Sequence, residues 1–259
     1  MRVLMVGDIV GAPGRAVFRE VVARLRAAGA VHAVVANAEN AAAGQGLTAD
    51  LGDELLAAGA DVLTLGDHTW NQKGMDAYLA RERRVVRPAN FAPVCPGRGW
   101  TTVQTPQGPL TVASLVGRVF LPPADCPFRA ADALLAIAPG GTPIVVDFHA
   151  EATSEKIAMG LHLDGRVAAV LGSHTHVQTS DEKLLPRGTA YITDVGMTGP
   201  IHSVIGREIE PVLHKFTTGM PAKFEVARGP ASLEGVIVDL DRATGRAVSI
   251  TRVREYAGR

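Results

Sequence analysis

Short apolar runs alternate with longer amphipathic segments over the first ninety residues. Val3–Val6, His32–Ala36 and Val62–Leu65 are brief apolar runs bounded by Gly or polar residues, as is typical of buried strands. Between these runs, apolar residues recur at helical spacing. Three strand–helix units in a row predict an α/β sheet with right-handed crossovers. Three helices are predicted. The first covers residues 17–28, the second begins at a Thr48 cap and ends at Gly59, and the third covers residues 72–79.

The middle of the chain changes character and then returns to alternating elements. Trp100–Gln104 and Leu110–Leu115 alternate around Pro106-Gln107-Gly108, which predicts a hairpin. Beyond it the pattern predicts two more helices and three more strands. The helices are Phe128–Ala138 and a Ser154-capped segment reaching Leu163, and the strands are Ile144–Phe148, Val167–Leu171 and Ala190–Thr193.

The C-terminal part predicts one helix and an antiparallel set of strands. The helix is expected near Arg207–Phe216, and Lys223–Ala227, Glu234–Leu240 and Ala247–Val253 alternate like strands, with a turn at Asp241–Gly245. We find no repeat and no clear linker. The pattern predicts an α/β fold in which two mixed β-sheets pack together with helices outside, as a single domain over residues 1–259.

Composition narrows the classes of function. The net charge is zero, so we expect no stable nucleic-acid complex and no attraction to an anionic membrane. No apolar run approaches the ~20 residues of a membrane span. The N-terminus becomes acidic at Asp8, too early for a signal peptide. Cys95 and Cys126 form no metal-binding pair, and we interpret them as unpaired thiols of a cytoplasmic protein.

Carboxylates, an amide and imidazoles follow five of the predicted strands. In open α/β sheets, ligands bind beyond the carboxyl ends of the strands, so these side chains are expected to meet in one metal site. Taken singly, Asp8 could be a helix cap, Glu39-Asn40 a turn and His149 a buried core residue. The occurrence of all these motifs in this order is far less expected by chance than any one of them alone. The residues are Asp8, Glu39-Asn40, Asp67-His68, His149 and His174-Thr175-His176.

Several other functional motifs fail at the positions where they would have to occur. The glycines after Val6 match neither a phosphate-binding loop nor a dinucleotide fingerprint. Val177-Gln178 breaks the His-x-His-x-Asp-His pattern of the metallo-β-lactamases. Mixed nitrogen and oxygen ligands without thiolate suit Mn, Fe or Zn.

The order of these motifs resembles that of the calcineurin-like metallophosphoesterases, and two departures resemble their YmdB-like bacterial branch. Val10 stands where the superfamily has the His of its Asp-x-His motif, two residues after the first Asp, and Glu39-Asn40 replaces Gly-Asp. The resemblance covers nearly the whole chain. It is carried by Val6–Gly11, Ala38–Asn40, Asp147–Lys156, Gly172–Gln178 and Asp194–Met197.

The resemblance implies a four-layer αββα sandwich and a two-metal site that hydrolyses phosphodiesters, with 2′,3′-cyclic nucleotides as the expected substrates. A hydroxide bridging the metals would attack phosphorus, and His68 would be the general acid. Iron is the favoured metal, with manganese or zinc as alternatives. The implied ligands are Asp8, Glu39, Asn40 and His176 for the first metal, and Glu39, Asp67, His149 and His174 for the second.

One departure concerns the charge of the site. The family usually has Asn where this chain has Asp67, and Asp where it has Asn71. We expect Asp67 to add a third carboxylate, which favours Fe³⁺ and weakens the binding of anionic substrates.

Two other functions stay open from the sequence. One is a phosphomonoesterase or protein phosphatase, and the other is a regulatory protein that uses the metal site only to bind a nucleotide or partner. The presence of His68 beside a full ligand set favours an enzyme. The expected partner is a small phosphoester, and a homo-oligomer is consistent with the family.

Overall fold

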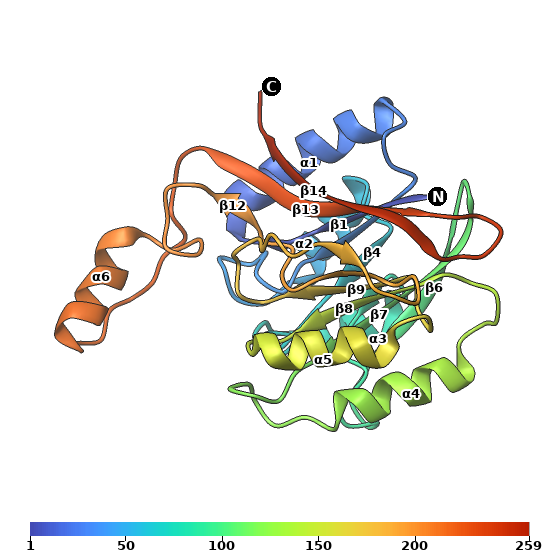
Figure 1. Ribbon diagram of the computed structural model, residues 1–259. Helices are drawn as coiled ribbons and strands as arrows, with labels where there is room; N and C mark the ends of the chain where they lie inside the picture. The colour runs from blue at the N-terminus through green and yellow to red at the C-terminus, as the bar shows by residue number, and fades with distance from the viewer. Residues whose placement is uncertain (259) are drawn as a thin grey trace.

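Two β-sheets pack face to face in the computed structural model, which describes residues 1–258 (Figure 1). The first, called sheet one, runs in the order β2-β12-β13-β1-β3-β4-β5, with β14 beside β13. Strands β1, β3, β4 and β5 are parallel, and β13 is antiparallel to β1. Its strands are β1 (Arg2–Val6), β2 (Asp8–Ile9), β3 (Ala33–Asn37), β4 (Val62–Thr64), β5 (Val85–Val86), β12 (Met197–Pro200), β13 (Ala231–Leu240) and β14 (Ala247–Tyr256).

The second sheet, called sheet two, runs in the order β10-β11-β9-β8-β7-β6. Its central strands β7, β8, β9 and β11 are parallel, whereas β6 and β10 are antiparallel at the edges. Both sheets are therefore mixed, as the sequence predicted. The strands are β6 (Trp100–Thr105), β7 (Gly108–Val116), β8 (Ile144–His149), β9 (Ala169–Ser173), β10 (Lys183–Leu184) and β11 (Ala190–Ile192).

Helices cover the two outer faces of the sheet pair. Helix α1 lies against sheet one and helices α4 and α5 against sheet two, while α6 projects away from the sheets (Figure 1). This arrangement confirms the expected αββα layers. The helices are α1 (Gly11–Ala27), α2 (Ala49–Ala57), α3 (Met75–Arg81), α4 (Pro127–Ile137), α5 (Thr153–Leu163) and α6 (Ile209–Thr218). No helix among the described residues is long and apolar enough to span a bilayer.

Alternation along the strands divides the core into three layers. In β1, Val3 and Met5 pack between the two sheets, whereas Leu4 and Val6 pack against α1 and α2. A third cluster lies between sheet two and helices α4 and α5. Because successive strand residues point to opposite faces, a strand buried on both faces must be apolar throughout. This explains why the first strands are uninterrupted apolar runs.

Some predicted elements differ from the structure. The predicted strand Lys223–Ala227 is wrong, because the segment forms only an isolated bridge between Arg207 and Val226. Helix α5 begins at Thr153 and has no side-chain cap, so the predicted cap at Ser154 is also wrong. The cap at Thr48 is confirmed, since its Oγ1 accepts a hydrogen bond from Leu51 N–H at 3.4 Å.

Candidate metal centre

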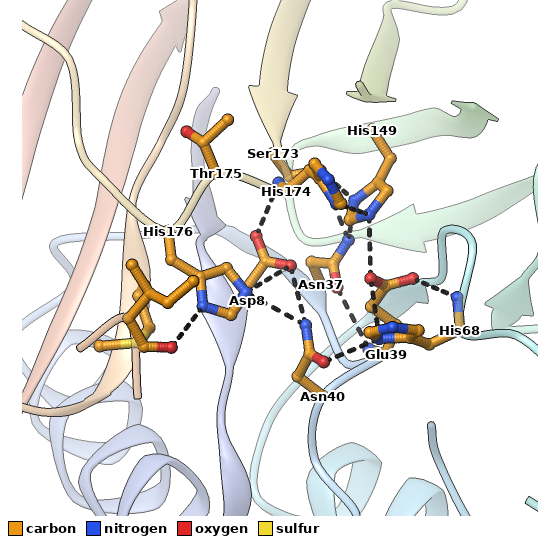
Figure 2. A network of polar contacts seen from close by, with 12 residues as sticks. Asp8, Asn37, Glu39, Asn40, His68, His149, Ser173, His174, Thr175 and His176 are labelled. Atoms are coloured by element: carbon orange, nitrogen blue, oxygen red, sulfur yellow. Dashed lines mark hydrogen bonds and ion pairs between the residues drawn. The ribbon is translucent and has the colours of Figure 1, made fainter. Parts of the chain in front are cut away.

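All eight predicted site residues converge at the carboxyl ends of strands from both sheets. Asp8 follows β1, Glu39 and Asn40 follow β3, and Asp67 and His68 follow β4. His149 ends β8, and the loop after β9 carries His174 and His176. Figure 2 shows most of these side chains turned toward one another, with Asp8 between His176 on one side and His149 and Glu39 on the other. The sheet topology therefore brings together residues that lie far apart in the sequence, from Asp8 to His176.

Four of the residues form a tight group of potential ligand atoms. One atom from each of Glu39, Asp67, His149 and His174 lies within 4.8 Å of the others. His149 Nε2 is 2.9 Å from Glu39 Oε1, 3.0 Å from Asp67 Oδ1 and 3.0 Å from His174 Nδ1. This set is the one that the family resemblance implied for the second metal.

A buried relay orients the His149 ring. Ser173 Oγ donates to Asp147 Oδ1 at 2.6 Å and lies 2.9 Å from His149 Nδ1. Burial raises the pKa of Asp147 to about 6. Because the Ser173 proton goes to Asp147, its oxygen accepts from His149 Nδ1–H. Nε2 of His149 then faces Glu39 and Asp67, and this nitrogen would bind a metal ion once it has released its proton.

The other residues form a second group beside the first. His176 Nε2 is 3.6 Å from Asp8 Oδ1, and Asn40 Nδ2 is 3.3 Å from Asp8 Oδ1 and 3.2 Å from His176 Nε2. His176 Nδ1 lies 3.0 Å from the Ile205 carbonyl and donates to it, so Nε2 is the ring nitrogen that faces Asp8. Asp8 is fully buried, and its Oδ2 accepts from His174 N–H at 3.1 Å.

The electrostatics of the site favour a bound cation. Burial opposes ionisation of Asp67, but its hydrogen bond and charge interaction with His149 hold its pKa at about 2. Burial likewise opposes ionisation of Asp8, yet His176 holds the pKa of that carboxyl well below its usual range. Burial alone would lower the pKa of His149, but Glu39 and Asp67 raise it well above the ordinary value. The site thus stabilises positive charge.

The residues fit a metal ion. Glu39 Oε1 is buried and accepts no hydrogen bond, although His149 Nε2 lies only 2.9 Å away. Buried carboxylate oxygens normally have a donor or a metal as partner, so Glu39 Oε1 is suited to hold a metal ion. The close packing explains Gly66, because a Cβ there would lie 2.2 Å from the His149 ring and 2.5 Å from Glu39 Oε2.

His68 lies at the edge of this centre and is partly open to solvent. Its backbone N–H donates to Glu39 Oε2 at 3.1 Å, and its Nδ1 is 3.0 Å from Asn40 Oδ1. The ring is 27% exposed, whereas His149 is fully buried. Its Nε2 is 3.8 Å from Asp67 Oδ2. His68 is thus held by its neighbours and can still reach a bound molecule.

The loop that carries His174 and His176 is strained and firmly held. Both residues have positive φ angles, of 101° and 62°, which cost roughly 1–3 kcal/mol each for residues other than Gly. Between them, Thr175 donates its N–H and Oγ1–H to Asp194 Oδ2 at 3.0 and 2.8 Å. Lys156 Nζ donates to the same oxygen and to Ser173 O, both at 2.7 Å.

These supporting residues had no assigned role in the sequence prediction. Asp147, Lys156 and Asp194 lie in stretches that carry the family resemblance, but the sequence pattern alone does not indicate what they do. Asp147 gave a signal, because it is a charge inside the apolar strand Ile144–Phe148. Asn71, in contrast, is exposed, whereas Asp67 of the same turn contributes an atom to the ligand group.

Comparison with known proteins agrees with this geometry. The sequence profile described as "YmdB-like protein" matches residues 4–253. The chain belongs to the YmdB-like family. It is 48% identical over 254 residues to a Bacillus subtilis protein named 2′,3′-cyclic-nucleotide 2′-phosphodiesterase, covering 98% of this chain and 96% of the relative. The family therefore contains phosphoester hydrolases.

Two solved structures share the fold over nearly their whole length. A hypothetical protein from Thermus thermophilus has a TM-score of 0.93 and 42% identity, with 99% of each chain covered. A structure described as a novel phosphatase from Mycoplasma pneumoniae has a TM-score of 0.92 and 34% identity, covering 99% of this chain and 93% of that one. The sandwich around the candidate metal centre is thus the family's fold.

Proposed function

We propose that this YmdB-like chain is a phosphodiesterase that hydrolyses 2′,3′-cyclic nucleotides at a two-metal centre, with residues 1–259 acting as one domain. The observation that carries the proposal is the convergence of Glu39, Asp67, His149 and His174 within 4.8 Å, directly beside Asp8. The substrate class follows from the name of the Bacillus subtilis relative.

The ligand sets are assigned as the motifs suggest. Iron is the favoured ion, and manganese or zinc suit the same ligands. Two such ions polarise the phosphoryl oxygens and lower the pKa of water to give a nucleophile. The first ion is assigned to Asp8, Glu39, Asn40 and His176, and the second to Glu39, Asp67, His149 and His174, so that Glu39 is shared.

Asn40 connects the first ligand set to His68. In the structure its NH₂ group faces Asp8 and His176, and its oxygen faces His68 Nδ1. A metal ion would be held by the amide oxygen of Asn40, so the side-chain amide would have to turn over. The NH₂ group then donates to His68 Nδ1, which leaves the His68 proton on Nε2.

That proton serves the leaving group. As the P–O2′ bond breaks, the departing 2′ oxygen takes the proton from His68 Nε2, and the product keeps a 3′ phosphate. Such general acid catalysis contributes roughly 10²–10⁴-fold in rate. Binding alone does not need an acid at this position, so His68 favours catalysis over a purely regulatory role for the site.

The leaving group of the substrate tests the role of His68. We expect His68→Ala to keep both metals and to lose about 10²–10⁴-fold in kcat on 2′,3′-cyclic AMP. On bis(p-nitrophenyl) phosphate the loss is expected to be much smaller, because p-nitrophenolate leaves without a proton. His162→Ala is the matched control, since His162 lies on α5 and pairs with Asp132 away from the site. Equal losses on both substrates would refute the acid role.

A phosphatase is the second candidate, since the Mycoplasma pneumoniae structure is described as a novel phosphatase. Analysis of the products formed from cyclic and non-cyclic nucleotides distinguishes the phosphatase from the proposed phosphodiesterase. Phosphate release from 2′- or 3′-AMP, without opening of the cyclic phosphate, would favour a phosphomonoesterase over the proposed phosphodiesterase.

A further inference from the structure

A cavity of about 480 Å³ opens beside the metal centre. Asp67, one of the proposed ligands, forms part of its wall, so the cavity and the metal centre are continuous. The rest of the wall is mostly apolar. It includes Trp70, Phe91, Val116, Pro122 and Asp125. The proposed chemistry uses none of these side chains.

Two aromatic rings line this cavity. The Trp70 and Phe91 ring centroids are 6.2 Å apart, and their planes are inclined by 32°. Trp70 is 40% exposed, which leaves much of its ring open to a ligand. Large aromatic side chains left open beside a catalytic centre are suited to stacking against a flat ring.

The position of Trp70 relative to the metal centre is fixed by the turn that carries both. Thr69 Oγ1 donates to Gly66 O at 2.6 Å, and Asn71 N–H donates to His68 O at 3.1 Å. Asp67, His68 and Trp70 therefore belong to one rigid turn. A molecule whose phosphate sits at the metals and whose ring stacks on Trp70 would engage all three.

The rim of the cavity carries a carboxylate without a partner. Within residues 1–258, the Asp125 side chain makes no hydrogen bond or ion pair, whereas its backbone is held by Asn90 through bonds of 2.9 Å in both directions. A carboxylate repels phosphate and accepts hydrogen bonds from amino groups. It therefore suits the amino-bearing edge of a base and is unsuited to the phosphate end of the substrate.

We propose that this cavity is a nucleobase subsite, in which the base stacks on Trp70 and its amino edge faces Asp125. The proposal rests on the proposed function for the placement of the phosphate. It assigns the substrate as a nucleotide with an amino-bearing base, so that adenine, guanine and cytosine are preferred over uracil. A phosphodiester without a base leaves the cavity empty.

Kinetics on substrates with and without a base test the subsite. Loss of one base–aromatic stack corresponds to about 5–150-fold in affinity, so Trp70→Ala should lower kcat/KM on 2′,3′-cyclic AMP by that factor, mainly through KM. Hydrolysis of glycerol 1,2-cyclic phosphate, which has no base, should be unchanged. Trp70→Phe should restore most of the loss, and Trp100→Phe is the control at the other Trp of the chain. Equal losses on the two substrates, or none on either, would overturn the proposal.

A binding measurement separates this proposal from the proposed function. In Trp100→Phe protein, Trp70 is the remaining Trp, and adenosine carries a base but no phosphate. We expect saturable quenching of Trp70 fluorescence by adenosine and none by ribose. Quenching in a protein that fails to hydrolyse cyclic nucleotides would uphold the subsite and reject the substrate assignment. Absence of quenching would overturn the subsite, whatever the turnover.

Discussion

Lys156 is the buried cation behind the His174–His176 loop, and its replacement by methionine tests how that loop is held. Its side chain is 1% exposed, and its partner Asp194 is fully buried. Methionine keeps most of the apolar stem, so little cavity is created. The change therefore isolates the loss of the charge and of its two hydrogen bonds, to Asp194 and to Ser173 O.

The expected magnitude follows from the charge left behind. Asp194 would keep its bonds to Thr175 but would be an uncompensated buried carboxylate, which costs about 3–5 kcal/mol. For a chain of this size, each kcal/mol corresponds to about 2–4 °C, so we expect the melting temperature of Lys156→Met to fall by about 6–20 °C. The metal content after dialysis should fall as well, because the strained loop that positions His174 and His176 would be less firmly held.

Thermal denaturation with two further variants makes this test decisive. Adding Asp194→Asn to Lys156→Met should recover part of the loss, because no buried charge is then left unpaired. Lys223→Met is the matched control, since Lys223 is 86% exposed in its pair with Glu225, and it should melt like the wild type. A single Lys156→Met variant that melts within error of the wild type would refute the reasoning.

The remaining predictions concern the ligand shell itself. With two divalent ions and one hydroxide, the carboxylates of Asp8, Glu39 and Asp67 give a neutral centre, so Asp67→Asn should leave one positive charge, lower KM for anionic substrates and disfavour Fe³⁺. Unchanged KM and unchanged redox behaviour of the metals would contradict this account. Gly66→Ala should place a methyl group against the His149 ring and reduce binding to one ion per chain, whereas Gly140→Ala, which has open space around it, should bind two. Metal analysis of both Gly variants checks this, and two ions bound to Gly66→Ala would count against the assigned second site.

The sequence predicts a strand correctly where the composition of that strand alone indicates a buried position. Val3–Val6 and Val167–Leu171 are apolar on both faces, so strand and burial follow from local composition, and the polar residues after them mark the carboxyl edge of a sheet. The segment Lys223–Ala227 alternates between polar and apolar residues, yet it forms only an isolated bridge, between Val226 and Arg207. In contrast, β12 contains Gly199 and Pro200, and it forms a strand because β13 and Asp8–Ile9 lie on either side of it.

The candidate site also contains residues that the sequence predicts and residues that it does not predict. The residues that face the centre lie at strand ends and could be anticipated, and the structure brings all eight together. The roles of the residues that position these side chains could not be predicted, because each role depends on contacts between distant segments. Asp194 is 38 positions from Lys156 and acts on a loop between them, and Ser173 relays Asp147 to His149 across two strands.

The central claim is that this centre works with two metal ions, and the most direct test is turnover of 2′,3′-cyclic AMP as a function of metal bound per chain. Metal-free protein would be titrated with iron, manganese or zinc while bound metal and product are measured together. The account predicts that turnover appears only as the second ion binds and that the product carries a 3′ phosphate. Full turnover with one ion or none, or no turnover with two ions bound, would contradict it.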